Sequence, residues 1–337
     1  MVKFSPFALA VLTGLALAVP AAAQDAQKPE LQIVTYDGFT SEWGPGLPLK
    51  AGFEATCDCT VTFVAADSSI GALRKVQLEG ATTTIDIVLG IDTAIAGEAR
   101  ATGLFADHGL DLSGLALPSA WTDAQFVPFD WGYFAYVYDT TKVTEPPKSF
   151  EELIARPESF KIAIQDPRSA TPGLGHLLWI KAAYGDKAAD IWTGLKPHIL
   201  TMTREWSESY ALFLNGEVDM VLSYTTSPAY HAIADGKPNY AYAEFAEGHL
   251  PQIEVAGVLK SSPHQDLAKQ FLAYLVTPEA QKIIPTTNWM YPVVDLGAEL
   301  PPAFSAQAKP AKVLGVEEAD ITAKSGGWID EALAAIQ

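Results

Sequence analysis

The chain has 337 residues, with 22 lysine and arginine residues against 40 aspartate and glutamate residues, so its formal net charge is −18. This negative charge argues against a nucleic acid or an anionic membrane surface as a partner. Hydrophobic residues make up 49% of the chain and charged residues 18%, which is enough apolar material for packed cores in about two domains. Acidity keeps an exported protein soluble, and it also favours a cationic ligand.

The first 23 residues have the pattern of a secretory signal peptide. Lys3 supplies the positive start, residues 7–19 form an apolar core, and the alanines at 21–23 provide a cleavage site. The apolar stretch is too short for a membrane span, and no later segment approaches about 18 uninterrupted apolar residues. Because no cysteine directly follows the cleavage site, a lipid anchor is not expected. We expect a mature protein exported to a bacterial periplasm.

Strands and helices are expected to alternate along the rest of the chain. β-branched and aromatic residues predict strands at 31–37, 59–65, 83–90, 160–166 and 218–224. Helical periodicity predicts helices at 173–185, 266–276 and 329–337, and an Ala-rich stretch predicts another at about 93–105. This alternation favours an α/β architecture with parallel or mixed sheets. No low-complexity linker is visible, so ordinary strands are expected to join two domains.

Three of the predicted strands are followed by a hydroxyl-rich turn that starts a helix. In the turn TTSP (225–228), Ser227 is the expected N-cap and the following proline is the first helical residue. Thr171 before a proline repeats this arrangement, and Ser68 or Ser69 is the expected cap of a third helix. Such turns lie at the carboxyl ends of strands, where α/β sheets bind ligands, and they expose unpaired N–H groups. Capping alone explains each turn, but together the three helix starts could enclose a phosphate.

The chain has only two cysteines, Cys57 and Cys59, in the sequence TCDCT. In an oxidising compartment these thiols are expected to form a disulfide. Two ligands are too few for a closed zinc site, and the six histidines show no metal-binding spacing. We therefore expect a local staple rather than a metal or redox centre.

Aromatic residues are a second candidate feature, because 8 tryptophans are an unusual supply. Trp43 lies in SEWGPG, Trp206 in TREWSESY and Trp289 in TTNWMYP, all polar or turn-like surroundings. Packing explains any one of them, but as a set they offer faces for a flat or cationic ring, each worth about 0.5–2 kcal/mol. Tyr224 and Tyr230, on either side of the TTSP turn, could do the same.

The sequence contains no clear catalytic motif. It lacks a G-x-S-x-G nucleophile elbow, an S-x-x-K set with its partners and a dinucleotide fingerprint. Ser227 and His231 are four residues apart and Asp219 could orient the histidine, but an N-cap serine is a poor nucleophile. Paired carboxylates are possible among 40 acids, yet nothing marks a pair. We expect a binding protein rather than an enzyme.

Several long blocks closely resemble the periplasmic thiamine-binding proteins of bacterial thiamine ABC transporters. The blocks are TYDGFTSEWGPG (35–46), IDIVLGID (85–92), FVPFDWGYFAYVYD (126–139), QDPRSATPGLG (165–175), WSESYALFLNGEVDMVLSYTTSPAYH (206–231) and PTTNWMYPV (285–293). The C-x-C at 57–59 also matches, and the resemblance covers about residues 31–295.

The resemblance implies an α/β, two-lobe periplasmic-binding-protein fold of type II, with mixed sheets and hinge strands between the lobes. Residues 24–130 and about 250–295 would form lobe I, and residues 131–249 would form lobe II. Residues 296–337 would be a C-terminal helical region that packs on the lobes.

The resemblance also implies a ligand site between the lobes. Its residues would be Ser68, Ser69, Ala170, Thr171, Trp206, Tyr224, Thr225, Thr226, Ser227, Tyr230 and Trp289, with Trp43 and Tyr36 as weaker correspondences. Tyr224 would supply a ring or a hydroxyl, and Thr225 and Thr226 would supply N–H and O–H donors. Two departures concern the phosphate end of the ligand. Ser68-Ser69 replaces an acidic residue and a glycine of the relatives, and Ala170 replaces a serine.

The implied function is capture of thiamine, thiamine monophosphate and thiamine diphosphate in the periplasm, followed by delivery to a membrane permease of an ABC transporter. No metal and no cofactor are expected, and a monomer is the default for this class. A ferric-ion-binding protein of the same fold is an alternative, although the chain has no adjacent pair of tyrosines. A binder of another cationic or phosphorylated small molecule, or a hydrolase or transferase acting on a thiamine-like compound, are further alternatives.

Overall fold

The computed structural model describes residues 1–2, 28–307 and 309–337. Nearly all of the signal peptide expected at 1–23 lies outside the described residues. Within the described ranges, no helix is long and apolar enough to cross a membrane.

The first lobe is built from strands and helices at both ends of the described chain. Its first part comprises β1 (Glu30–Tyr36), α1 (Asp37–Thr40), α2 (Gly46–Glu54), β2 (Thr60–Ala66), α3 (Ser69–Glu79), the 3-10 turn η1 (Gly80–Thr82), β3 (Ile87–Asp92) and α4 (Ala96–Ala101). Its second part comprises β9 (Pro251–Val258), α10 (Gln265–Leu275), α11 (Pro278–Gln281), α12 (Ile284–Thr287) and β10 (Tyr291–Pro292).

The second lobe comes from the middle of the chain. It comprises α5 (Phe150–Ile154), β5 (Ile162–Gln165), α6 (Thr171–Tyr184), η2 (Gly185–Lys187), α7 (Ala188–Leu195), η3 (Lys196–His198), β6 (Ile199–Thr203), α8 (Trp206–Leu214), β7 (Met220–Tyr224), α9 (Ser227–Ala234) and β8 (Tyr240–Ala243). After the first lobe is complete, the chain continues through η4 (Gly297–Glu299) and α13 (Pro302–Ser305) to α14 (Glu318–Ile336).

Strand β4 (Phe126–Asp139) joins the two lobes. Its residues 126–133 pair antiparallel with β9, and its residues 134–138 pair antiparallel with β7. The strand order is β2-β1-β3-β9-β4-β7-β5-β6, with β10 and β8 also paired to β4. All residues of β4 except Asp139 are buried, as expected for a central strand covered on both faces. Parallel and antiparallel pairs occur together, so the expectation of a mixed α/β sheet is confirmed.

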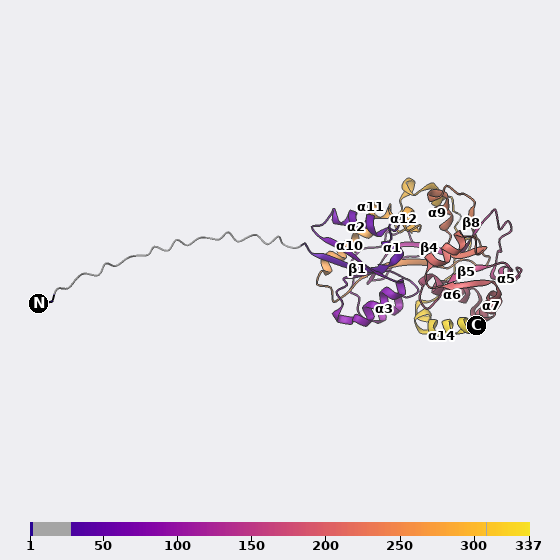
Figure 1. The fold of residues 1–337 in the computed structure, drawn as a ribbon, viewed down its shortest axis with the longest axis horizontal. Helices are drawn as coiled ribbons and strands as arrows, with labels where there is room; N and C mark the ends of the chain where they lie inside the picture. The colour runs from indigo at the N-terminus through magenta and orange to yellow at the C-terminus, as the bar shows by residue number, and fades with distance from the viewer. Residues whose placement is uncertain (3–27, 308) are drawn as a thin grey trace.

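Helices cover both faces of the first-lobe strands. Alternate residues of β1 point to opposite faces, so Leu31 and Ile33 pack with Leu49 and Phe53 of α2, whereas Val34 packs with Leu73 of α3. Figure 1 shows α2 and α10 on one side of β1 and α3 on the other. This layering places the ends of the strands, and the turns that follow them, at the boundary between the lobes.

Two predicted elements differ in extent from the structure. The helix expected at about 93–105 is only six residues long, α4, because Gly103 follows with a φ of 69° that a helix cannot accommodate. The strand expected at 83–90 is β3, which begins at Ile87 and runs on to Asp92. The added residue Asp92 matters below, because it extends the strand to the lobe boundary.

The C-terminal helix α14 packs on both lobes. It contacts α4 of the first lobe and α6 and α7 of the second. Glu318 in its first turn pairs with Arg100 of α4, and Glu331 pairs with Lys181 of α6 at 3.1 Å. Figure 1 shows α14, in yellow, alongside α6 and α7. Cys57 and Cys59 form a disulfide in the segment between α2 and β2.

Candidate ligand-binding cleft

A cavity of about 630 Å³ lies between the two lobes, and we call it the front cleft. The first lobe lines it with the end of β1, the turn after β1 and the start of α3. The second lobe lines it with the starts of α6, α8 and α9, and the segment from α12 to β10 closes another side. Nine of the expected site residues line the front cleft: Tyr36, Trp43, Ser69, Thr171, Trp206, Tyr224, Ser227, Tyr230 and Trp289.

Tyr36, the last residue of β1, is held in place by its hydroxyl group. The hydroxyl donates to Glu254 Oε2 at 2.9 Å, and Asn288 Nδ2 donates to it at 3.2 Å. Gly90 allows the ring to pack against β3, because a Cβ at this position would lie 2.5 Å from Tyr36 ring carbons. Trp43, in the turn after α1, remains 53% exposed at the cleft and so has ring surface available to a ligand.

Trp206 begins α8 and has a fixed ring orientation. Its ring stacks on Tyr210 with centroids 4.5 Å apart and 25° between the planes. Its Nε1 donates to Ser223 Oγ at 2.8 Å, and Ser223 Oγ lies 2.8 Å from Ser227 Oγ. A ligand that stacks on this tryptophan would meet a preorganised surface, because the indole does not need to be immobilised on binding.

Trp289 has an unusual backbone conformation. Among the described residues it is the only non-glycine with positive φ, at 58°. Such a conformation is a genuine outlier for a bulky residue and costs about 1–3 kcal/mol. Its backbone N–H donates to the Ile284 carbonyl at 3.1 Å, and its ring meets Tyr230 edge-on at 5.0 Å. Trp289 lines the front cleft, and the surrounding structure maintains its strained conformation, which is a frequent feature of residues with a functional role.

The helices α3, α6, α8 and α9 begin at the front cleft, and three of them, α3, α6 and α9, have the starts predicted from the sequence, but α6 and α9 are capped differently from the prediction. Ser68 is the N-cap of α3 and accepts from the Gly71 N–H at 2.9 Å, as the sequence predicts. The N-cap prediction is wrong for Thr171 and Ser227. Ala170 is the N-cap of α6 and Thr226 is the N-cap of α9, so Thr171 and Ser227 are the first helical residues. Ala170 has no capping group, and Thr226 does not use its hydroxyl as a cap. The hydroxyls of Thr171 and Ser227 therefore do not cap their helices, and Ser69, Thr171 and Ser227 all line the cleft.

Four expected site residues, Ser68, Ala170, Thr225 and Thr226, do not line the front cleft. Thr225 and Thr226 are completely buried, and the Thr225 N–H donates to the Tyr133 carbonyl at 2.9 Å. The Ala170 N–H is likewise used by the Asp166 carbonyl at 3.0 Å. The donor role expected of Thr225 and Thr226 stays a prediction: the Thr225 N–H is used by β4, whereas Thr225 Oγ1 is buried without a hydrogen-bond partner in the described part of the chain.

The front cleft is acidic. Asp37, Glu205 and Glu254 line it, and none of its described lining residues is lysine, arginine or histidine. Asp37 belongs to the first lobe and Glu205 to the second, so two carboxyl groups face one cleft from opposite lobes. Burial, followed by the charge of Asp37, raises the pKa of Glu205 to about 8. Glu205 Oε1 is buried without a hydrogen-bond partner in the described part of the chain. A cation would relieve this accumulation of negative charge.

Sequence reasoning missed several lining residues, among them Asp37, Glu205, Tyr210, Glu254 and Asn288. Glu205 and Asn288 directly precede the predicted tryptophans, so their proximity could have been noticed. Glu254 stands alone in the apolar run of β9, and an unpaired acid in a buried strand is a recognisable signal of function. Nothing local marks Tyr210, which reaches the cleft only because α8 stacks it beneath Trp206.

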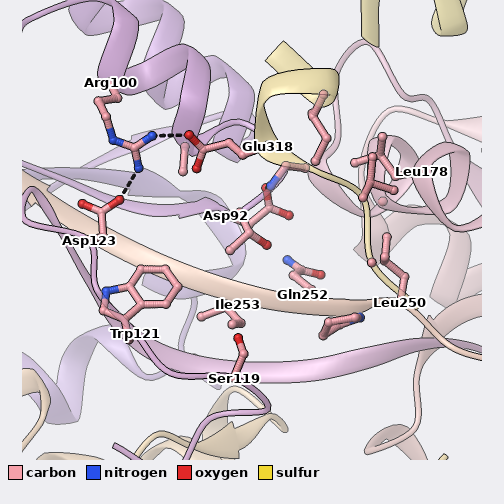
Figure 2. A pocket seen from close by; sticks show the side chains of 18 of the residues that line it. Asp92, Arg100, Ser119, Trp121, Asp123, Leu178, Leu250, Gln252, Ile253 and Glu318 are labelled. Carbon is pink, nitrogen blue, oxygen red and sulfur yellow. Dashed lines mark hydrogen bonds and ion pairs between the residues drawn. The ribbon is translucent and has the colours of Figure 1, made fainter. Parts of the chain in front are cut away.

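A second cavity, of about 690 Å³, lies between the first-lobe loops, the strands β4 and β9, α6 and the segment leading to α14. We call it the rear cavity. Figure 2 shows Arg100 between Asp123 and Glu318, and both ion pairs are formed. Trp121 donates its Nε1 to the Phe126 carbonyl at 2.9 Å. The Arg100 guanidinium and the Trp121 N–H are thus already satisfied within the protein, whereas Gln125 Oε1 and Gln252 Oε1, which also belong to lining residues, have no hydrogen-bond partner in the described ranges.

The residues considered for catalysis do not form a triad. Ser227 Oγ lies against Ser223 Oγ, whereas His231 Nε2 lies 2.9 Å from the Tyr210 hydroxyl and His231 Nδ1 3.1 Å from Asp235. Asp219 accepts from the backbone N–H of Lys161 at 2.7 Å. In the described ranges, no group of three or more His, Cys, Asp or Glu residues is arranged to hold a metal ion.

Comparison with known proteins agrees with this geometry. Residues 49–311 match the family model described as bacterial extracellular solute-binding protein. The thiamine-binding periplasmic protein of Brucella abortus is 47% identical over 98% of this chain and 97% of its own length. The corresponding protein of Escherichia coli is 45% identical over 90% of this chain and 92% of its own.

Solved structures show the same relationship. A periplasmic thiamin binding protein superimposes with a TM-score of 0.89 at 44% identity, covering 92% of this chain and 97% of that one. Iron-bound HitA from Pseudomonas aeruginosa has a TM-score of 0.73 at 21% identity, covering 91% of this chain and 99% of HitA, which shows a shared fold alone. The expected two-lobe fold of type II is therefore confirmed. The chain belongs to the bacterial extracellular solute-binding proteins and, among them, to the periplasmic thiamine-binding proteins of ABC transporters.

Proposed function

We propose that the protein captures thiamine, thiamine monophosphate and thiamine diphosphate in the front cleft and delivers them to the permease of an ABC transporter. The observation that carries this proposal is the convergence of aromatic rings from both lobes on a cleft whose described lining has acidic but no basic side chains. The names of the relatives, thiamine-binding periplasmic proteins, support the same ligand.

The aromatic lining suits the two rings of thiamine, a flat aminopyrimidine and a positively charged thiazolium. Trp206, at the start of α8, and Trp289, between α12 and β10, supply indole rings to the cleft lining, and Tyr36 and Tyr230 add further ring surface. Each contact between a cation and an aromatic face is worth about 0.5–2 kcal/mol, and more when water is excluded. Closure of the two lobes around the ligand would bury both rings and supply the remaining affinity.

The phosphate of the esters would be bound by the helix starts. The first residues of α3, α6 and α9 line the front cleft, and the first N–H groups of a helix have no partners within it. Each helix terminus contributes about 0.3–1 kcal/mol towards an anion, or up to about 2 kcal/mol when partly buried. Arg204 pairs at 3.3 Å with Asp67, which directly precedes the N-cap of α3, so this ion pair links the two lobes next to one of these helix starts.

The remaining parts of the proposal concern the transport role. The mature protein would be a periplasmic monomer exported by the signal peptide at 1–23, with no metal and no cofactor. Lobe I would comprise residues 24–130 and about 250–295, and lobe II residues 131–249. The C-terminal region 296–337 would pack against both. Changes in the relative position of the lobes around β4 and β9 would tell the permease whether ligand is bound.

Isothermal titration of refolded, ligand-stripped protein with thiamine and its two phosphates tests the proposal. Refolding in the absence of ligand removes molecules retained through purification. We expect one ligand per chain and submicromolar dissociation constants for at least one of the three forms. Absence of binding by all three forms would contradict the proposal, and weaker binding of both esters than of thiamine would remove the helix starts as a phosphate site.

A further inference from the structure

Three acidic residues form a row across the strands that connect the lobes. In the sheet, Glu254 of β9 is directly paired with Asp92 of β3 on one side and with Asp130 of β4 on the other. Side chains of directly opposed residues in antiparallel strands share one face, with Cβ atoms about 4.5–5.5 Å apart. Like charges in this arrangement repel one another, so the row is an unfavourable placement for three ionised carboxylates.

The acidic row, defined as Asp92, Glu254 and Asp130, is buried and lacks a protein counter-ion. The exposed fractions of these residues are 1%, 7% and 0%. None of the ion pairs of the described residues includes any of them. Their hydrogen bonds come from neutral groups, with Asn288 donating to Asp130 and Tyr36 donating to Glu254. Asp130 Oδ1 is buried without a hydrogen-bond partner in the described ranges.

Buried carboxyl groups that lie side by side have a lower free energy when they are protonated than when all of them are ionised. Burial raises the pKa of Asp92 to about 7 and that of Asp130 to about 7. Burial, and then the charge of Asp130, raises the pKa of Glu254 well above its usual range. The other groups that face the row are Tyr36 from β1, Tyr224 from β7, Gln252 from β9 and Asn288 after α12; none of these is a cation near neutral pH.

We propose that the acidic row is the counter-ion of the bound ligand's positive ring, selects for a permanent positive charge, and releases a proton when that ring binds. This inference rests on the proposed function, because it assigns the charge recognition within the front cleft. Glu254 lines the cleft and presents the row to the ligand. The charge balance is simple, since one proton leaves a carboxyl group for solvent as one ligand cation takes its place.

The row also has a side that the ligand does not cover. Asp92 and Gln252 line the rear cavity, and Gln252 Nε2 donates to Glu254 Oε1 at 3.3 Å. Figure 2 shows Asp92 and Gln252 beside each other in the rear cavity. Gln252 Oε1 is buried without a hydrogen-bond partner in the described part of the chain, so it can accept from a water molecule there. The row is therefore bordered by the front cleft at Glu254 and by the rear cavity at Asp92.

Proton release is measured by titrating ligand-stripped protein with thiamine at pH 7 in two buffers of different ionisation enthalpy, MOPS and Tris. We expect release of about one proton, and a thiamine affinity that rises by up to about tenfold per pH unit between pH 6 and pH 8. Deazathiamine, whose neutral thiophene ring has the shape of the thiazolium, should bind without proton release and without this pH dependence.

The variant Glu254→Gln keeps the shape of the side chain and can still accept from Tyr36. We expect proton release to fall close to zero and thiamine affinity at pH 8 to fall at least tenfold, with deazathiamine affinity changed less than about threefold. Glu205→Gln is the matched comparison, because Glu205 is the other cleft carboxyl with a raised pKa. If proton release on thiamine binding persists in Glu254→Gln and disappears in Glu205→Gln, the proposal is overturned.

The result for the unmodified protein separates this inference from the proposed function. Tight thiamine binding with no proton release and no pH dependence would overturn the acidic row as counter-ion and leave thiamine capture intact. Failure of thiamine to bind at any pH would instead contradict the proposed function. The melting temperature of Glu254→Gln provides the folding control, and removal of a buried acid should not lower it.

Discussion

The front cleft and the rear cavity are similar in volume, about 630 and 690 Å³, but differ in what their side chains leave unsatisfied. In the rear cavity, Arg100 already pairs with two acids and the Trp121 N–H already has an acceptor, so only amide oxygens such as Gln252 Oε1 lack a partner among the described residues. In the front cleft, Glu205 Oε1 has no partner among the described residues, and Trp289 is held in a strained conformation. The comparison teaches that cavity size does not identify the ligand site. The kind of side chain does, because the front cleft combines aromatic faces and carboxyl groups without a basic residue among its described lining, whereas the rear cavity contains Arg100.

Loss of a ring from the front cleft should have the largest effect. We expect Trp289→Ala to weaken thiamine binding at least tenfold, or about 1.4 kcal/mol, because the indole face is lost. Trp289→Asn should weaken binding similarly and fold at least as stably, because asparagine tolerates positive φ. Trp121→Phe in the rear cavity is the matched control and should leave affinity unchanged. Equal losses for Trp289→Ala and Trp121→Phe, measured by titration, would break the distinction between the two cavities.

The hydroxyl at the start of α6 should have a smaller effect, and only on part of the ligand. Thr171 lines the front cleft, and its hydroxyl does not cap its own helix. We expect Thr171→Val to weaken binding of thiamine monophosphate about two- to tenfold, the value of one hydrogen bond, and to leave thiamine nearly unaffected. The measurement is parallel titration with both ligands. Equal losses would show that this helix start does not face the phosphate.

The acidic row between the two cavities predicts a stability that depends on pH. Its folded-state pKa values lie above those of exposed carboxyls, so the folded protein binds more protons than the unfolded chain between about pH 4 and 7. Stability of the ligand-free protein therefore decreases over this range as pH rises. The melting temperature of Glu254→Gln minus that of the unmodified protein should therefore increase by a few degrees as the pH rises from 5 to 8. If this difference in melting temperature does not change with pH, the row does not titrate in this range.

The smallest effect is expected at the ion pair between Arg204 and Asp67, which links the two lobes. Arg204 and Asp67 are 60% and 80% exposed, and such pairs contribute about 0–1 kcal/mol. We expect Arg204→Gln to change thiamine affinity less than about threefold, mainly through faster dissociation.

Arg100→Gln in the rear cavity should leave thiamine affinity unchanged and lower the free energy of unfolding by about 1 kcal/mol, since it leaves the mostly buried Asp123 without its cation. Stopped-flow dissociation and thermal unfolding distinguish the two.

Sequence patterns were sufficient for the strands and for the aromatic part of the cleft. Local runs of β-branched residues predicted β1, β2, β5 and β7 without knowledge of distant contacts. The tryptophans were likewise identified from their turn-like local sequence. The helix starts were found, but the caps at Thr171 and Ser227 were displaced by one residue, because a proline is accepted at the second helical position as well as the first.

The acidic row could not be derived from local sequence, because it depends on register. Asp92, Asp130 and Glu254 are far apart in the chain and become neighbours only through the pairing of β3, β9 and β4. The burial of Thr225 and Thr226 could not be derived for a related reason, since a hydroxyl-rich turn does not reveal which of its groups the adjoining strands will bury. Asp92, Asp130 and Glu254 do each follow or interrupt an apolar run of their strand, and an acid in such a run is a usable sequence signal.

A crystal structure of the protein with thiamine bound is the most direct test. We predict one molecule in the front cleft, with its rings between Trp206 and Trp289, its thiazolium towards Glu254 and its hydroxyethyl group towards the starts of α3 and α6. Thiamine bound in the rear cavity, or in the front cleft with the thiazolium turned away from Glu254, would contradict this assignment of charge and ring recognition.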